Sequence, residues 1–81
     1  MNEDLIEEYN GFIEKADVRL RLWQDRINES IDRLAATKRK GVIVLEVERI
    51  RDCYDQISKD EEHKKACIAR RDSLRERSVQ R

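Results

Sequence analysis

The sequence predicts an all-α protein, an antiparallel and coiled-coil-like helical hairpin that forms a single domain over residues 1–81. Three observations support this fold class. The composition combines 44% charged with 38% apolar residues and contains no proline, which is typical of long helices and coiled coils. Apolar residues recur at alternating steps of three and four, the spacing of a helix seam. The sign of the charge alternates in blocks along the chain.

The first helix is expected from about residue 3 to about residue 38, with Asn2 as its N-cap. Its seam follows positions 6, 9, 13, 16, 20, 23, 27, 30 and 34, of which eight are apolar. Ser30 is the exception, and we expect the neighbouring Ile31 to take over its packing role. Trp23 is expected in the core, with its indole N–H at the edge of the groove between the helices.

The turn is expected at about residues 38–41. Gly41 suits the left-handed position that often follows a helix end, and basic residues just before it suit the last turn of a helix. The second helix is then expected from about residue 42 to about residue 75, followed by a frayed basic tail over residues 76–81.

The apolar residues of the second helix predict a seam at positions 43, 47, 50, 54 and 57. Beyond these the apolar density falls, and the seam continues only through Cys67, Ile68 and Leu74. Two alternatives stay open. Residues 42–45, of which three are β-branched, would suit a short strand, and Ser58 with Glu61 would suit the capping box of a third helix.

The charge blocks predict how the segments pair. Residues 1–17 carry a net charge of −5, residues 18–40 carry +4, residues 41–63 carry −4 and residues 64–81 carry +5. Folding the chain back at Gly41 places blocks of opposite sign side by side, whereas a parallel in-register dimer would not. A single long helix that dimerises antiparallel about Gly41 meets the same condition, so it remains an alternative to the hairpin.

A second copy of the chain is the first partner that we predict. Two helices alone cannot cover both seams, and small helical hairpins usually dimerise into four-helix bundles. The candidate interface also includes apolar positions off the main seam. These are Val18, Leu22, Val42, Val44, Leu45 and Val47. The first turns of the second helix are apolar on all sides, so either the dimer mate or another protein is expected to cover them.

Nucleic acid is a possible but less favoured partner, because the formal net charge is zero and any electrostatic contact must be regional. The candidate contacts are the basic residues near the turn and in the tail, namely Lys38, Arg39, Lys40, Arg70, Arg71, Arg75 and Arg77. A regulator of this kind would be similar in architecture to the plasmid copy-number regulator Rop, a dimeric helical hairpin that binds RNA, although the two share no motif.

Enzymatic, metal and membrane functions find no support in the sequence. We identify no catalytic residue, no cofactor-binding residue and no metal ligand set, since His63 and Cys67 are four residues apart but lack further ligands. The longest apolar run, residues 42–45, is too short to span a bilayer. The acidic N-terminus does not resemble a signal peptide, so we expect a cytoplasmic protein whose Cys53 and Cys67 are reduced thiols.

The function predicted from the sequence is therefore a non-catalytic protein–protein interaction module. It would serve as an adaptor, a chaperone, or an inhibitor or other regulator of a larger assembly. Small self-contained hairpins of this kind fit a phage-encoded or plasmid-encoded origin. The alternative is the nucleic-acid-binding regulator described above.

Overall fold

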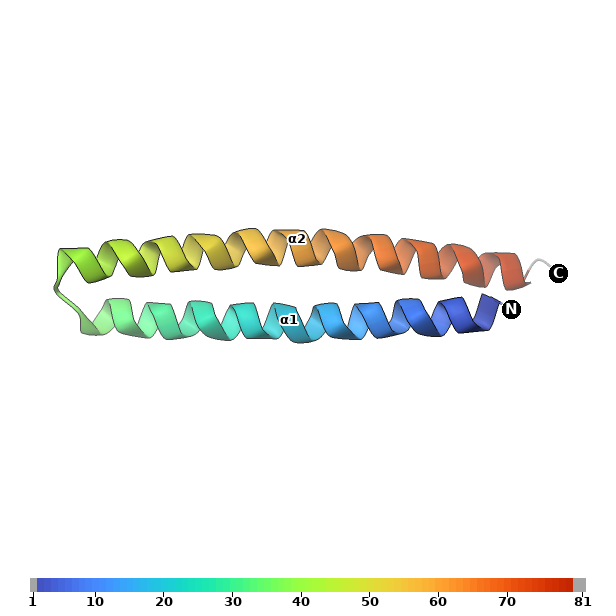
Figure 1. Ribbon diagram of the computed structural model, residues 1–81, viewed down its shortest axis with the longest axis horizontal. Helices are drawn as coiled ribbons and strands as arrows, with labels where there is room; N and C mark the ends of the chain where they lie inside the picture. The colour runs from blue at the N-terminus through green and yellow to red at the C-terminus, as the bar shows by residue number, and fades with distance from the viewer. Residues whose placement is uncertain (1, 80–81) are drawn as a thin grey trace.

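The computed structural model describes residues 2–79 and places them in two long antiparallel helices joined by a short turn (Figure 1). Helix α1 covers Asn2–Ala36 and helix α2 covers Lys40–Val79. The molecule is a rod of 64 × 14 × 12 Å, with the start of α1 beside the end of α2. The predicted all-α helical hairpin is confirmed.

The turn consists of residues 37–39 and uses side-chain and backbone hydrogen bonds in place of a left-handed residue. The Arg39 amide donates to Thr37 Oγ1 at 3.3 Å, and the Ile43 amide donates to the Arg39 carbonyl at 3.0 Å as α2 begins. Gly41 lies inside α2 and does not have a positive φ. The prediction of a left-handed Gly41 is therefore wrong, because the chain reverses before it reaches this residue.

Helix α2 is continuous over its 40 residues. It passes through residues 42–45 without forming a strand and through Ser58 without a break. It also extends to Val79, whereas the sequence predicted an end near residue 75. The remaining tail residues 80 and 81 lie outside the described residues. The β-branched residues at its start are helical because helix propensity is a weak preference that the surrounding structure overrides.

The predicted seam of α1 is confirmed, since each of its nine positions is buried or half-buried. Ile13, Ala16, Ile27 and Ser30 are the most deeply buried. The expected replacement of Ser30 by Ile31 is wrong, because Ser30 is only 2% exposed whereas Ile31 is 49% exposed. Ser30 is tolerated in the interface because its hydroxyl has a hydrogen-bond partner in Arg33.

The predicted seam of α2 is only partly correct. Ile50 and Ile57 are half-buried, but Ile43, Val47 and Tyr54 are 36%, 47% and 56% exposed. The most deeply buried residues are Cys67, which the predicted seam includes, and Glu46 and Cys53, which it does not. These lie seven or fourteen residues apart, so they share one face of the helix. The search for apolar residues selected a neighbouring face, because the true seam of α2 contains polar side chains that pair with α1.

Ion pairs between the helices confirm the pairing that the charge blocks predict. Lys64 contacts Asp17, which joins the first and last blocks. Arg19 and Asp60 are 3.1 Å apart, which joins the two middle blocks. Exposed pairs of this kind contribute roughly 0 to 1 kcal/mol each, so they select the antiparallel arrangement more than they stabilise it.

The interface between the helices is thin for a chain of this size. The accessible surface is 6652 Å², whereas a compact monomeric protein of 9.7 kDa exposes about 5,100 Å². The excess arises from the rod shape, in which each helix has only one neighbour (Figure 1). Large parts of both helices are therefore available to another molecule.

Candidate functional site

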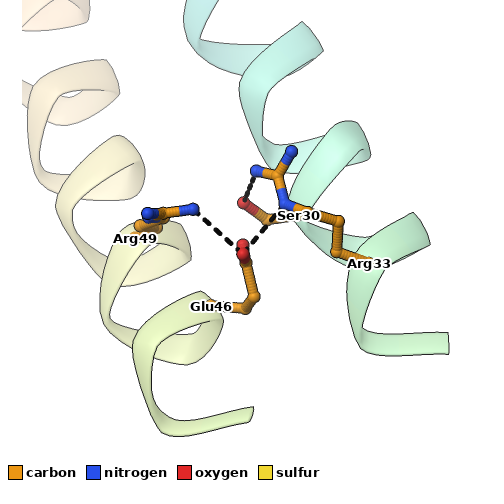
Figure 2. Close-up of polar contacts among 4 residues, drawn as sticks. All are labelled: Ser30, Arg33, Glu46 and Arg49. Atoms are coloured by element: carbon orange, nitrogen blue, oxygen red, sulfur yellow. Dashed lines mark hydrogen bonds and ion pairs between the residues drawn. The ribbon is translucent and has the colours of Figure 1, made fainter. Parts of the chain in front are cut away.

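The hairpin has two long sides with different chemistry, which we name by their residues near the turn. On one side Arg33 of α1 and Arg49 of α2 both contact Glu46, and we call this the arginine side (Figure 2). Ile31 and Val47 each precede one of these arginines by two residues, which is about 200° around a helix. They therefore lie on the opposite side, which we call the apolar side.

Glu46 is the centre of a buried polar cluster on the arginine side. Its Oε1 atom accepts hydrogen bonds from Arg33 Nε at 2.9 Å and from Arg49 Nη1 at 3.0 Å, while Arg33 Nη2 also donates to Ser30 Oγ at 3.3 Å (Figure 2). The residue is only 3% exposed, and its Oε2 atom is buried without a hydrogen-bond partner. A buried charge of this kind needs its partners, so the cluster favours one register of the two helices.

The electrostatics of the cluster favour the ionised form of Glu46. The hydrogen bond from Arg33 is the largest cause of a pKa below the usual value for glutamate, and burial opposes this shift. Ser30 and the positive charges of Arg33 and Arg49 lower the pKa further. The carboxylate therefore serves as a structural anion, held between two guanidinium groups.

Further along the arginine side, Trp23 and Arg26 continue the same surface. The Arg26 guanidinium lies 4.9 Å from the centre of the Trp23 ring, within the range of a cation–π contact. Trp23 and Arg26 line a shallow hollow together with Arg33 and Arg49. Arg33 and Arg49 were not among the residues considered from the sequence, although Arg33 continues the seven-residue spacing of Arg19 and Arg26.

The apolar side and the start of α2 carry the largest group of exposed apolar side chains near the turn. Ile43, Val44, Leu45 and Val47 are 36%, 56%, 54% and 47% exposed, and we call these four residues the apolar turn end. Successive residues of a helix are 100° apart, so they point in several directions. Val42, a further candidate, is half-buried and belongs to the interface with α1.

The other two interface candidates lie elsewhere on the rod. Val18 and Leu22 are 63% and 45% exposed, one turn apart on α1. Leu22 precedes the end of α1 at Ala36 by fourteen residues, which is about 21 Å along the helix. The structure therefore does not join Val18 and Leu22 with the apolar turn end into one surface.

The basic candidates form two separate groups. Lys38, Arg39 and Lys40 lie at the turn, whereas the arginines at positions 70–77 lie at the opposite end of the rod (Figure 1). Two of the latter have partners in the hairpin, because Arg71 binds Asp72 and Asn10 while Arg75 is 4.0 Å from Asp72. These candidates do not form one continuous basic surface.

The two cysteines contribute to packing, whereas the single histidine is exposed beside one of them. Cys53 and Cys67 are buried free thiols, and Cys67 Sγ lies 3.7 Å from His63 Nε2. Within residues 2–79 no group of three or more His, Cys, Asp or Glu side chains is arranged to hold a metal ion. In the same part of the chain, neither helix combines the length and hydropathy needed to cross a membrane.

Sequence reasoning missed three exposed residues on the apolar side. Ile43 and Tyr54 were assigned to the core of the hairpin, and Ile31 was expected to pack there, but all three are exposed. The signal for the buried face of α2 was a second series of residues seven apart, which begins at the polar residue Glu46. Ser30 interrupts the apolar seam of α1 in the same way, and a buried polar residue there requires a polar neighbour.

No family model matches this chain, and no curated protein or solved structure is significantly similar to it.

Proposed function

We propose that the protein is a non-catalytic protein–protein interaction module whose contact surface includes the apolar turn end. The observation that carries this proposal is the exposure of Ile43, Val44, Leu45 and Val47, which follow one another within a single helix. Isolated exposed apolar residues are common, but four of them within five consecutive residues leave the exposed part of this helix end largely apolar, which is typical of an interaction site. Removing such side chains from water contributes about 25 cal/mol for each Å² of apolar surface, which is the main driving force for association.

The shape of the molecule supports the same proposal. A thin rod of two helices places its functional surface on the outside of the helices, because each helix has only one neighbour to cover it. Proteins of this form suit roles as adaptors, chaperones, or inhibitors and other regulators of a larger assembly. The proposal includes a cytoplasmic location and a homodimeric state, in which a second copy covers part of the exposed surface.

Substitution of Leu45 tests the proposal. Tagged wild-type protein and the variants Leu45→Ser and Leu22→Ser are used to capture partners from the native host, with helicity checked by circular dichroism. We expect the Leu45→Ser variant to lose a partner that the wild type retains, because a leucine buried in an interface contributes about 1.5 to 3 kcal/mol. The Leu22→Ser variant should retain that partner, since Leu22 lies about 21 Å from the end of α1.

Two results would count against this assignment. Full retention of every partner by Leu45→Ser removes the apolar turn end as a contact surface. Loss of the partner only with Leu22→Ser moves the contact surface to the middle of α1, where Val18 also lies. Both variants replace residues that are about half exposed, so both are expected to fold.

A nucleic-acid-binding role is the second candidate, and it is favoured by one specific observation. Arg26, Arg33 and Arg49 gather along one hollow beside the Trp23 ring, and guanidinium groups bind phosphate well. All three arginines already contact Glu46 or the tryptophan, which makes them less available to phosphate. Binding of a labelled RNA or DNA at two salt concentrations tests it, since phosphate contacts weaken steeply as salt rises. Absence of binding at low salt excludes this role.

A further inference from the structure

We infer that a second copy of this chain docks on the apolar side, through an antiparallel contact between the turn-proximal halves of the two α2 helices. The contact surface is the series Ile43, Val47, Ile50, Tyr54 and Ile57, which we call the outer stripe. The inference rests on the proposed function and names the partner for one side of the hairpin. It also gives the register of the contact, which follows from the order of residues along α2.

The outer stripe has the spacing of a coiled-coil seam but is only partly covered within the hairpin. Its positions advance by steps of four and three, as in a helix that packs against another helix. Ile43, Val47 and Tyr54 are 36% to 56% exposed, while Ile50 and Ile57 are half-buried. α2 thus carries two seams: α1 buries the one that contains Glu46, Cys53 and Cys67, and it covers the outer stripe only in part.

The charged residues at the two ends of the stripe make it self-complementary. Lys40, Val47, Tyr54 and Glu61 follow one another at intervals of seven, so they form one column on the helix. In an antiparallel pair centred beside Ile50, Lys40 of one copy faces Glu61 of the other, and Val47 faces Tyr54. A single two-fold axis generates both ion pairs, as expected for the isologous contact of a homodimer.

Neither charged residue is engaged within the hairpin. Lys40 and Glu61 are exposed, and neither has an ion pair or hydrogen bond through its side chain among the described residues. They are 21 residues apart on one helix, which is about 32 Å, so they cannot contact each other within one chain. If the effects of substituting Lys40 and Glu61 on dimerisation depend on each other, the two side chains must therefore contact each other between two chains.

Other arrangements of two copies are less favourable. A parallel pair in register sets Lys40 against Lys40 and Glu61 against Glu61, which is repulsive. In an antiparallel pair that overlaps along the whole of α2, the outer stripe of one copy lies against the second half of α2 of the other copy. That half carries Glu61 and Arg75 on the corresponding face. Only the overlap of the turn-proximal halves combines apolar contact with opposite charges.

The surface areas are also consistent with this contact. The chain exposes about 1,500 Å² more than a compact protein of its mass. A standard stable interface buries about 800 Å² on each partner, which is within this excess. Ile31 of α1 lies on the same side of the hairpin near Val47, so the first helix adds to the contact. The four helices then overlap only near the two turns, and the dimer is longer than the 64 Å of one hairpin.

A charge-exchange experiment on the full-length protein tests the inference. Sedimentation velocity over a concentration series is measured for the wild type, Lys40→Glu, Glu61→Lys and the double variant that carries both substitutions. We expect a wild-type dimer, a roughly three- to tenfold weaker dimer for each single variant, and recovery in the double variant, because each substitution turns two attractive contacts into two repulsive ones. Glu62→Lys is the charge-matched control, since the neighbouring Glu62 lies about 100° away and should leave the dissociation constant unchanged.

A second pair of variants tests the apolar contact. Val47→Asp should abolish the dimer, whereas Val18→Asp should not, although Val18 is the more exposed residue at 63% against 47%. Circular dichroism confirms that both variants remain helical. Small-angle X-ray scattering of the wild type should give a maximum dimension of roughly 95 Å, because two rods of 64 Å would overlap by about 32 Å.

Several outcomes overturn the inference. The first is a wild-type protein that is still monomeric at 100 times the concentration used for wild-type partner capture. The second is a Val47→Asp variant that still forms the dimer. The third is a double variant whose dimer dissociation constant is no lower than that of either single variant. In each case the proposed interaction function stands or fails separately, because it depends on the loss of a heterologous partner in Leu45→Ser. A dimer that behaves as expected, combined with full partner retention by Leu45→Ser, supports the inference and counts against a heterologous contact at Leu45.

Discussion

The Trp23 indole of α1 donates a hydrogen bond to Asp60 Oδ2 of α2 at a distance of 2.8 Å. Asp60 Oδ1 accepts a second hydrogen bond from Arg19 Nε at 3.1 Å, so one carboxylate joins two residues of the opposite helix. This contact lies near the middle of the rod. It therefore fixes the register of the helices at a point far from the turn.

Removal of the indole donor should destabilise the hairpin. We expect Trp23→Phe to lower the free energy of unfolding by about 2 kcal/mol, because a hydrogen bond to a charged acceptor contributes about 1.5 to 3 kcal/mol. Urea denaturation followed by circular dichroism measures the change. Tyr54→Phe is the control, since Tyr54 has no hydrogen-bond partner through its side chain among the described residues and should change stability by less than about 0.5 kcal/mol. Equal effects of the two substitutions would show that the Trp23–Asp60 bond is not important.

The stability of the protein should depend on pH through Glu46. The pKa of this residue is lower in the folded than in the unfolded state, chiefly because of the hydrogen bond from Arg33. The stabilisation is therefore fully present above the ordinary glutamate pKa of about 4.3, and is lost as the pH falls through the lower folded value. Unfolding curves measured from pH 7 to pH 3 should show this loss for the wild type.

Glu46→Gln isolates the contribution of that carboxylate. The variant should be less stable than the wild type at pH 7, and its stability should fall less on acidification, so the two curves converge at low pH. Glu48→Gln is the matched control, because Glu48 is exposed and its side chain has no ion pair among residues 2–79. Parallel curves for the wild type and Glu46→Gln would contradict this account of the cluster.

The glycine near the turn should tolerate a side chain. Gly41 has no positive φ, and a Cβ atom added there meets nothing within 4 Å. Gly41→Ala should therefore stabilise the protein by about 0.4 to 1 kcal/mol, because alanine restricts the unfolded chain more than glycine does. Gly11→Ala, in the interior of α1 with equally open surroundings, should give a similar gain by thermal denaturation. A loss of stability confined to Gly41→Ala would instead support the left-handed turn residue that the sequence suggested.

The two isoleucines of the fourth heptad should differ sharply. Ile27 is 1% exposed and Ile31 is 49% exposed. Ile27→Ala should lower the free energy of unfolding by about 2 to 4 kcal/mol, as expected for a fully buried residue. Ile31→Ala should change the stability of the hairpin by less than about 1 kcal/mol at concentrations where the protein is monomeric. A comparable loss in both variants would restore the packing role first expected of Ile31.

The sequence predicted α1 better than α2, and the reason is physical. The seam of α1 is apolar apart from Ser30, so its spacing identifies the buried face directly. The face of α2 toward α1 includes Glu46, Asp60 and Lys64, which are tolerated there because α1 supplies partners of opposite charge. A search for apolar residues alone selects the outer stripe, because that face of α2 is the more hydrophobic.

The candidate site could be predicted only in part. Val44, Leu45 and Val47 were identified because residues 42–47 are apolar on nearly every side, and all three are exposed. Tyr54 was missed because the seam assigned to α2 placed it in the core. The predicted turn extends two residues too far because glycine is a common helix terminator and Gly41 was taken as its end, whereas Thr37 and Arg39 provide the necessary hydrogen bonds.

Photo-cross-linking from position 47 in the native host tests the central claim most directly, namely that the apolar side is a contact surface. A photoreactive phenylalanine analogue replaces Val47, and the same analogue at position 62 serves as the exposed control. We predict an adduct of two 9.7 kDa chains from position 47, with the cross-link mapped to the segment around Tyr54 of the second copy, and no such adduct from position 62. Equal cross-linking from both positions, or none from position 47, would contradict the claim.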